Sequence, residues 1–101
     1  MRVNVVVALL FGFCASHASA HSLFMECREA DTDIHCQAGF SDGSSAKDLP
    51  FEVISYADQL LTSGEAKAEG FSFPLPQTDY FILLDAGPGH VVEVDMGEVS
   101  R

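Results

Sequence analysis

Two runs of alternating apolar and polar residues flank the dipeptide Asp31-Thr32, and each run carries one cysteine. The runs span residues 21–29 and 33–41. Alternation with a period of two is typical of strands that bury one face, and a short polar pair between two such runs predicts a hairpin. Around a two-residue turn at Asp31-Thr32 the numbers of facing residues sum to 63, so Cys27 faces Cys36. This hairpin restricts the chain to folds built around an antiparallel strand pair.

The same register groups the apolar residues of the hairpin. Leu23 faces Phe40 and Met25 faces Ala38, on the face that also carries the cysteines. The two cysteines occupy a non-hydrogen-bonded pair, in which side chains approach most closely. A cysteine pair could instead bind a metal, but two thiols without further cysteine partners in an oxidising compartment favour a disulfide. We therefore predict a disulfide across this hairpin.

The remaining β-forming runs are short, and no stretch has the spacing of a long amphipathic helix. They cover residues 51–56, 59–62, 71–75, 79–85 and 90–96, with Gly, Pro, Asp and Ser between them. Seven short strands predict an all-β fold, a seven-stranded antiparallel β-sandwich of the Greek-key type. Residues 57–69 are the weakest part of this interpretation, because Ala, Glu and Lys there could form a helical turn. The expected core contains Leu23, Met25, Phe40, Phe51, Val53, Phe73, Ile82, Leu84, Val92 and Val94.

The first twenty residues have the features of a cleavable signal peptide. Arg2 gives a positive start, and an almost wholly apolar run covers residues 3–13. Residues 18–20 then provide the small-x-small pattern after which signal peptidase cuts. The apolar run is too short to span a bilayer comfortably, and no later stretch approaches the ~20 apolar residues of a membrane span. The alternative, an uncut N-terminal anchor, is less consistent with this pattern.

Cleavage would divide the chain into a signal peptide of residues 1–20 and a single β-sandwich domain of residues 21–101. Without Arg2 and Cys14, the remaining 81 residues contain two cysteines, with four basic against fifteen acidic residues, a formal charge of −11. This acidic balance argues against nucleic-acid binding and against docking on anionic lipid. A domain of this size is marginally stable, and one ten-residue disulfide loop would contribute roughly 2.5–3 kcal/mol. We expect a periplasmic protein without a direct membrane anchor.

Cleavage at this position would also make His21 the N-terminal residue and create a candidate metal site. An N-terminal histidine offers an α-amine and an imidazole nitrogen, which together chelate ions such as Ni²⁺ or Cu²⁺. The hairpin register places Asp42 opposite His21, where the carboxylate could add an oxygen ligand. The structural alternative is that His21 only follows the scissile bond and frays in solvent.

Two other histidines are weaker candidates for the same site. His90 follows the turn of residues 87–89 and could supply a second imidazole, or it could be only a polar residue at a strand start. His35 faces Arg28 on the solvent side of the hairpin, so a metal role for it is the least favoured.

Three segments of the chain resemble the small periplasmic accessory subunits of energy-coupling-factor-type nickel/cobalt transporters. They are His-Ser-Leu-Phe-Met-Glu-Cys at 21–27, Gly-Phe-Ser-Asp-Gly-Ser at 39–44, and residues 71–90, which end in Leu-Asp-Ala-Gly-Pro-Gly-His. Residues 53–70 are similar to carboxypeptidase-regulatory-like, transthyretin-like sandwiches. The resemblance covers nearly the whole chain after residue 20. Its most specific part is the Leu-Asp-Ala-Gly-Pro-Gly-His segment at residues 84–90. It implies a transthyretin-like sandwich with a non-enzymatic role beside a membrane permease in Ni²⁺ or Co²⁺ uptake.

Catalytic interpretations have little support in the sequence, and we expect no enzyme. No Ser/His/Asp, Cys/His or phosphate-loop pattern is recognisable. Transthyretin-like hydroxyisourate hydrolases end in Tyr-Arg-Gly-Ser, whereas this chain ends in Val99-Ser100-Arg101. Three hypotheses remain: an accessory protein of nickel or cobalt uptake, a periplasmic Cu²⁺-binding protein with an N-terminal histidine chelate, or a metal-free sandwich that pairs with a partner through an open edge.

Overall fold

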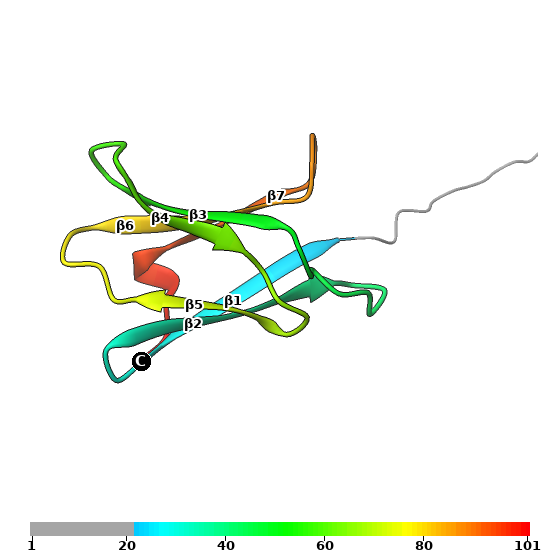
Figure 1. Ribbon diagram of the computed structural model, residues 1–101, viewed down its shortest axis with the longest axis horizontal. Helices are drawn as coiled ribbons and strands as arrows, with labels where there is room; N and C mark the ends of the chain where they lie inside the picture. The colour runs from blue at the N-terminus through cyan, green and yellow to red at the C-terminus, as the bar shows by residue number, and fades with distance from the viewer. Residues whose placement is uncertain (1–21) are drawn as a thin grey trace, which may run out of the picture.

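In the computed structural model, which describes residues 22–101, seven short strands and one 3₁₀ turn follow one another along the chain. A three-stranded sheet has the order β1-β2-β5, and a four-stranded sheet has the order β4-β3-β6-β7. Figure 1 shows the two sheets as stacked layers. The predicted all-β architecture of seven antiparallel strands in two sheets is confirmed. The elements are β1 (Leu23–Ala30), β2 (Asp33–Phe40), β3 (Pro50–Ser55), β4 (Leu60–Glu65), β5 (Gly70–Pro74), β6 (Tyr80–Asp85), β7 (Val91–Asp95) and η1 (Met96–Glu98).

The β1–β2 hairpin has the register that the sequence predicts. Cys27 pairs with Cys36, and Leu23 pairs with Phe40. The turn at residues 31–32 is a two-residue turn in which Asp31 adopts a positive φ of 58°, a conformation that Asp tolerates better than most side chains. A disulfide joins the two cysteines, whose Cα atoms lie 4.0 Å apart. Because both residues are nearly fully buried, the disulfide is part of the core.

The core lies between the two sheets and contains most of the residues expected there. Its fully buried side chains include Val53, Ile82 and Leu84. Phe51 stacks on Phe71 with ring centroids 4.0 Å apart. The other expected core residues fall into two groups: Met25, Phe73 and Val94 are buried, and Leu23, Val92 and Phe40 are half-buried.

Several core residues are additional to those expected above. Tyr80 points inward and is buried, and so is Ile34, which alternation along residues 33–41 places on the face of Cys36 and Ala38. Ala46, Ala66 and Val99 are buried although they lie outside the strands. Their burial depends on how loops fold over the sheets, which alternation along a strand does not describe.

Within residues 57–69, which the sequence left open between strand and helical turn, residues 60–65 form a strand. β4 runs to residue 65, three residues beyond the expected end, and pairs with β3. A register shift between Val53 and Ile54 interrupts this pairing. Gly64 permits the close approach, since an added Cβ would lie 3.0 Å from the Phe51 ring.

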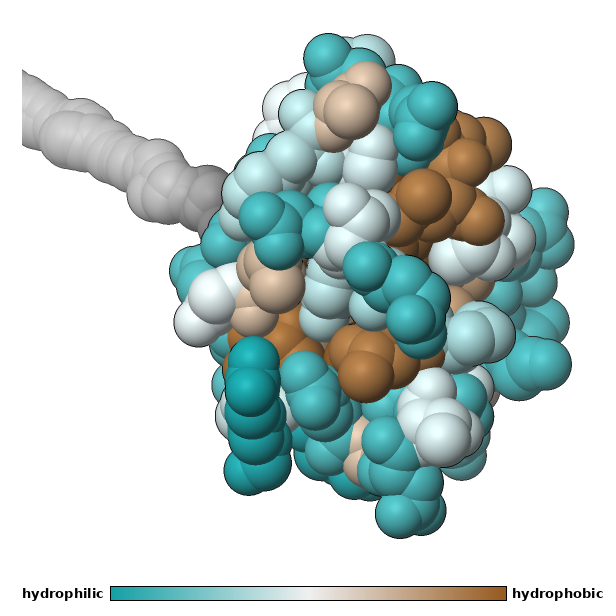
Figure 2. Space-filling view, turned by 90° about the vertical axis from the view of Figure 1, so that its left-hand side faces the viewer, coloured by the Kyte–Doolittle hydropathy of each residue, from teal (hydrophilic) through white to brown (hydrophobic). Residues whose placement is uncertain are grey.

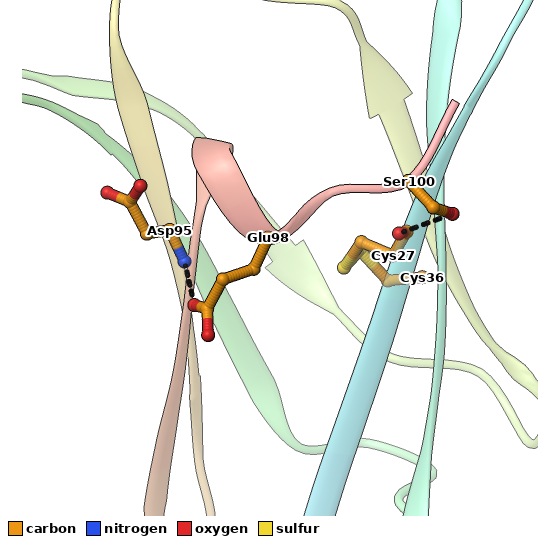
Figure 3. The surroundings of a disulfide bond; sticks show 5 residues. All are labelled: Cys27, Cys36, Asp95, Glu98 and Ser100. Carbon is orange, nitrogen blue, oxygen red and sulfur yellow. Dashed lines mark hydrogen bonds between the residues drawn. A yellow bond between two sulfur atoms is a disulfide. The ribbon is translucent and has the colours of Figure 1, made fainter.

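After β7 the chain turns back onto β1, a feature that the sequence analysis did not predict. Asp95 caps η1, and its N–H donates to the Glu98 carboxylate at 2.9 Å (Figure 3). Ser100 then pairs with β1: its N–H donates to the Cys27 carbonyl at 3.0 Å, and its carbonyl accepts from Glu29 N–H at 2.8 Å. The C-terminal residues therefore pair with a short stretch of edge strand β1, around Arg28, whose backbone groups would otherwise be unpaired.

Two further observations concern the compartment. No helix within residues 22–101 is long and apolar enough to cross a membrane. The disulfide is compatible with an oxidising compartment. The predicted signal peptide lies outside the described residues.

Candidate functional site

The loops of the sandwich divide into two groups, one at each end. Because neighbouring strands are antiparallel, loops 41–49, 66–69 and 86–90 lie at the end where β1 begins. We call this the amino-terminal end, which is the right-hand end in Figure 1. The turn 31–32 and loops 56–59 and 75–79 lie at the opposite end. Two of the predicted ligands, Asp42 and His90, therefore belong to loops at the same end of the molecule.

His21, the central residue of the predicted site, lies outside the described residues. The described part of the hairpin register ends at Ser22 and Ser41. The Ser41 N–H donates to the Ser22 carbonyl at 2.8 Å, and the Ser22 N–H donates to Ser41 Oγ at 2.9 Å. Ser22, the residue that follows His21, is thus fixed at the amino-terminal end, and its partner Ser41 directly precedes Asp42.

The loop that carries Asp42 is held by its own polar side chains. Asp42 Oδ1 accepts hydrogen bonds from Ser44 N–H at 2.9 Å and from Ser44 Oγ at 2.6 Å. Gly43 has a φ of +90°, which a glycine adopts without strain. Asp42 is exposed. The Ser-Asp-Gly-Ser segment thus stabilises the loop through the Asp42 carboxylate, and this carboxylate stays exposed to solvent.

His90 closes the β6–β7 turn through its backbone. Its N–H donates to the Gly87 carbonyl at 2.9 Å, and its carbonyl accepts from Ala86 N–H at 2.8 Å. The Gly87 N–H donates to Asp85 Oδ1 at 2.8 Å, and Gly87 and Gly89 have φ values of +107° and +80°. These bonds explain the Asp-Ala-Gly-Pro-Gly-His segment as a tight turn, and they leave the His90 side chain exposed.

His35 lies away from this end. It is on β2, opposite Arg28 on β1 and Ser72 on β5. Its side chain is half-buried on the outer face of the three-stranded sheet. The prediction that His35 faces Arg28 is confirmed, and His35 shares no loop with Asp42 or His90.

A hollow of about 630 Å³ lies beside the edge strands β4 and β5, and none of the residues that line it is Asp42 or His90. The aromatic rings of Phe51 and Phe71 form part of its wall, with Lys67 and His35 among the polar residues. The hollow and the predicted ligands are therefore separate features of the surface.

Within residues 22–101, no group of three or more His, Cys, Asp or Glu side chains is close enough to hold a metal ion. The predicted chelate uses His21, which lies outside this range. The predicted metal site thus depends on the N-terminal residue, with Asp42 and His90 as additional ligands.

The opposite end carries a polar pair that the sequence analysis missed. The Tyr56 hydroxyl donates to Asp95 Oδ1 at 2.5 Å. This hydrogen bond, together with desolvation and the negative charges of Asp95, Asp79 and Glu93, raises the pKa of Tyr56 to about 12. The same bond, with a second from the Gly97 N–H, lowers the pKa of Asp95. Alternation along β3 places Tyr56 on the outer face, but its contact with β7 depends on strand order, which the sequence does not reveal.

The sequence matches no protein-family model, and no curated protein or solved structure matches it.

Proposed function

We propose that this protein is a periplasmic accessory protein of nickel or cobalt uptake, which binds the divalent ion and presents it to a membrane permease. In this proposal residues 1–20 are removed and the His21 amine and imidazole chelate the ion. His90 or Asp42 completes the site. The observation that supports the proposal is the position of loops 41–49 and 86–90 at the end where the chain enters the sandwich.

The chemistry of these groups is consistent with a borderline divalent ion. Imidazole and amine nitrogens suit Ni²⁺, Co²⁺ and Cu²⁺, and a carboxylate can complete the coordination. The formal charge of −11 after cleavage raises the local concentration of cations around the protein. Both nitrogens must lose their protons before they bind, so the affinity should fall as the pH decreases from about 8 to 6.

Calorimetric titration with NiCl₂ tests the chelate. Protein that starts at His21 should bind one Ni²⁺. A variant extended by one N-terminal Gly should lose as much affinity as His21→Ala, because the extension moves the primary amine off the histidine. His35→Ala is the matched control and should bind as the unmodified protein does. Equal affinity of the extended and unextended proteins would exclude the N-terminal chelate.

Copper binding is the alternative to nickel binding at this site. Cu²⁺ binds most such nitrogen sites more tightly than Ni²⁺, so a higher affinity for Cu²⁺ does not by itself identify the physiological ion. Metal accumulation in cells that lack the protein distinguishes uptake of nickel or cobalt from a role in copper binding.

The proposal also includes the sandwich type. The resemblance implies a Greek-key, transthyretin-like sandwich. The strand order β1-β2-β5 and β4-β3-β6-β7 matches that of immunoglobulin-type sandwiches in which the fourth strand lies beside the third. An experimental structure of a nickel-transporter accessory subunit, compared strand by strand, distinguishes the two types.

A further inference from the structure

The outer faces of the two sheets differ in chemistry. On the three-stranded sheet, the outward residues include Glu26, Arg28, Gln37, His35 and Ser72, together with Phe24, which is 46% exposed. Apart from Phe24, this is the polar surface expected of a sheet that faces water. The four-stranded sheet instead directs a series of large apolar side chains outward: Ile54, Leu60, Phe81, Leu83 and Val91.

Strand register shows that these five residues, which we call the outer stripe, are contiguous. Ile54 on β3 pairs with Leu60 on β4 and with Phe81 on β6. Leu83 is two residues after Phe81 and shares its face, and Val91 on β7 is a diagonal neighbour of Leu83 across the β6–β7 ladder. The outer stripe therefore crosses all four strands from one edge of the sheet to the other.

The two ends of the outer stripe are the most accessible. Leu60 is 58% exposed and Val91 is 54% exposed. Leu61, next to Leu60 in the chain, adds exposed surface, and so does Tyr56, whose hydroxyl is bonded to Asp95 on β7. In Figure 2, which views the end with the β3–β4 turn, hydrophobic atoms reach the surface in the upper right part, on the side of the four-stranded sheet. Contiguous apolar surface with a polar rim is typical of interaction sites.

The charged side chains that the four strands of this sheet direct outward are all negative. Glu52, Asp85, Glu93 and Asp95 point outward from the same sheet, and the four strands contain no Lys or Arg. A second copy docked on this face would oppose carboxylates to carboxylates, and an anionic membrane would repel them. The complementary surface is a protein with apolar side chains at its centre and Lys or Arg around them.

We propose that the outer stripe docks a partner protein whose contacting surface is apolar at the centre and basic at the rim. The stripe ends at Val91, directly after His90, so this partner would also cover the amino-terminal end. Naming the permease as the partner rests on the proposed function.

Site-specific photo-crosslinking in cells that make the protein tests this inference. A photoreactive phenylalanine replaces Leu83 in one full-length chain and Gln37, on the outer face of the other sheet, in the control. The expected result is an adduct with one protein from position 83 and at least roughly tenfold less from position 37. Mass spectrometry of the adduct should place the crosslink in an apolar segment with Lys or Arg nearby.

Charge reversal completes the test. Glu52→Lys with Glu93→Lys should lower the adduct yield from position 83 by roughly tenfold or more, because like charges across an interface cost several kcal/mol. Glu26→Lys, on the outer face of the three-stranded sheet, is the matched control and should leave the yield unchanged. Each variant must keep the disulfide and the urea midpoint of the unmodified chain, and Val91→Ser provides an alternative if the double variant does not fold.

The outcomes separate the docking face from the proposed function. Adducts with a second copy or with lipid, equal yields from both positions, or no response to charge reversal would each overturn the docking face. An adduct with the permease from position 37 alone would overturn the proposed docking face on the four-stranded sheet but support the proposed role in metal uptake. A basic, apolar partner other than a metal permease would support the face and contradict the permease as partner.

Discussion

Reduction of the Cys27–Cys36 disulfide should destabilise the protein by an amount set by the loop that it closes. The two cysteines are nine positions apart, so the closed loop contains ten residues. In the chain-entropy model, loss of this constraint on the unfolded chain lowers the free energy of unfolding by about 2.7 kcal/mol at 25 °C. For a domain of this size the melting temperature should fall by roughly 10–20 °C.

The structure makes reduction a cleaner perturbation than substitution. Cys27 is 6% exposed and Cys36 is 4% exposed, so two thiols can occupy almost the same core volume as the disulfide. Alanine at both positions would add the cost of a cavity to the loss of the bond. The difference between the oxidised and reduced proteins therefore measures mainly the constraint on the unfolded chain.

Urea denaturation of both forms provides the measurement. The protein is reduced in urea and refolded under reductant, because both cysteines are nearly fully buried in the native state. The Cys27→Ala, Cys36→Ala variant has no bond to break and must show the same midpoint with and without reductant. A reduced protein within about 0.5 kcal/mol of the oxidised one would refute the loop-entropy argument.

Two further predictions concern the backbone and the Tyr56 hydrogen bond. Gly70→Ala should cost more than about 3 kcal/mol, because φ is +146° and a Cβ would lie 1.9 Å from the Cys36 carbonyl oxygen. Gly43→Ala, at φ +90° with open space around it, should cost only about 1–2 kcal/mol in the same urea assay. The Tyr56 phenol should ionise near pH 12 in an ultraviolet titration, and Asp95→Asn should lower its pKa toward the ordinary value of 10. Since the folded pKa is raised, the stability linked to Tyr56 is present below pH 10 and is lost as the pH rises through about 12. An unchanged Tyr56 titration in Asp95→Asn would show that the hydrogen bond does not cause the shift.

Local pattern predicted the strands, because each depends on alternation and on turn residues close to it in sequence. The hairpin register is the clearest case: a two-residue turn at Asp31-Thr32 fixes all pairs of β1 and β2, including Cys27 with Cys36. The same reasoning placed Ile82 and Leu84 in the core.

Features that depend on contacts between distant segments were not predicted. The pairing of Ser100 with β1 and the Tyr56–Asp95 bond both require the order of strands in the sheets. The outer stripe was missed for the same reason, since Ile54, Phe81 and Val91 become neighbours only when β3, β6 and β7 lie side by side. For the predicted site, Asp42 and His90 lie in loops at the same end of the molecule, His21 lies outside the described residues, and the grouping of the three stays a prediction.

Nickel accumulation in cells tests the central claim most directly. Cells with and without the gene are supplied with trace radioactive Ni²⁺ in a medium that limits nickel, and the metal that enters is counted over time. The account predicts that loss of the protein lowers the initial uptake rate, that the unmodified chain restores it, and that His35→Ala restores it equally. A chain with one Gly inserted before His21 should fail to restore uptake although it is folded and secreted. Equal nickel uptake with and without the protein, measured alongside cobalt with the same result, would contradict a role in metal uptake.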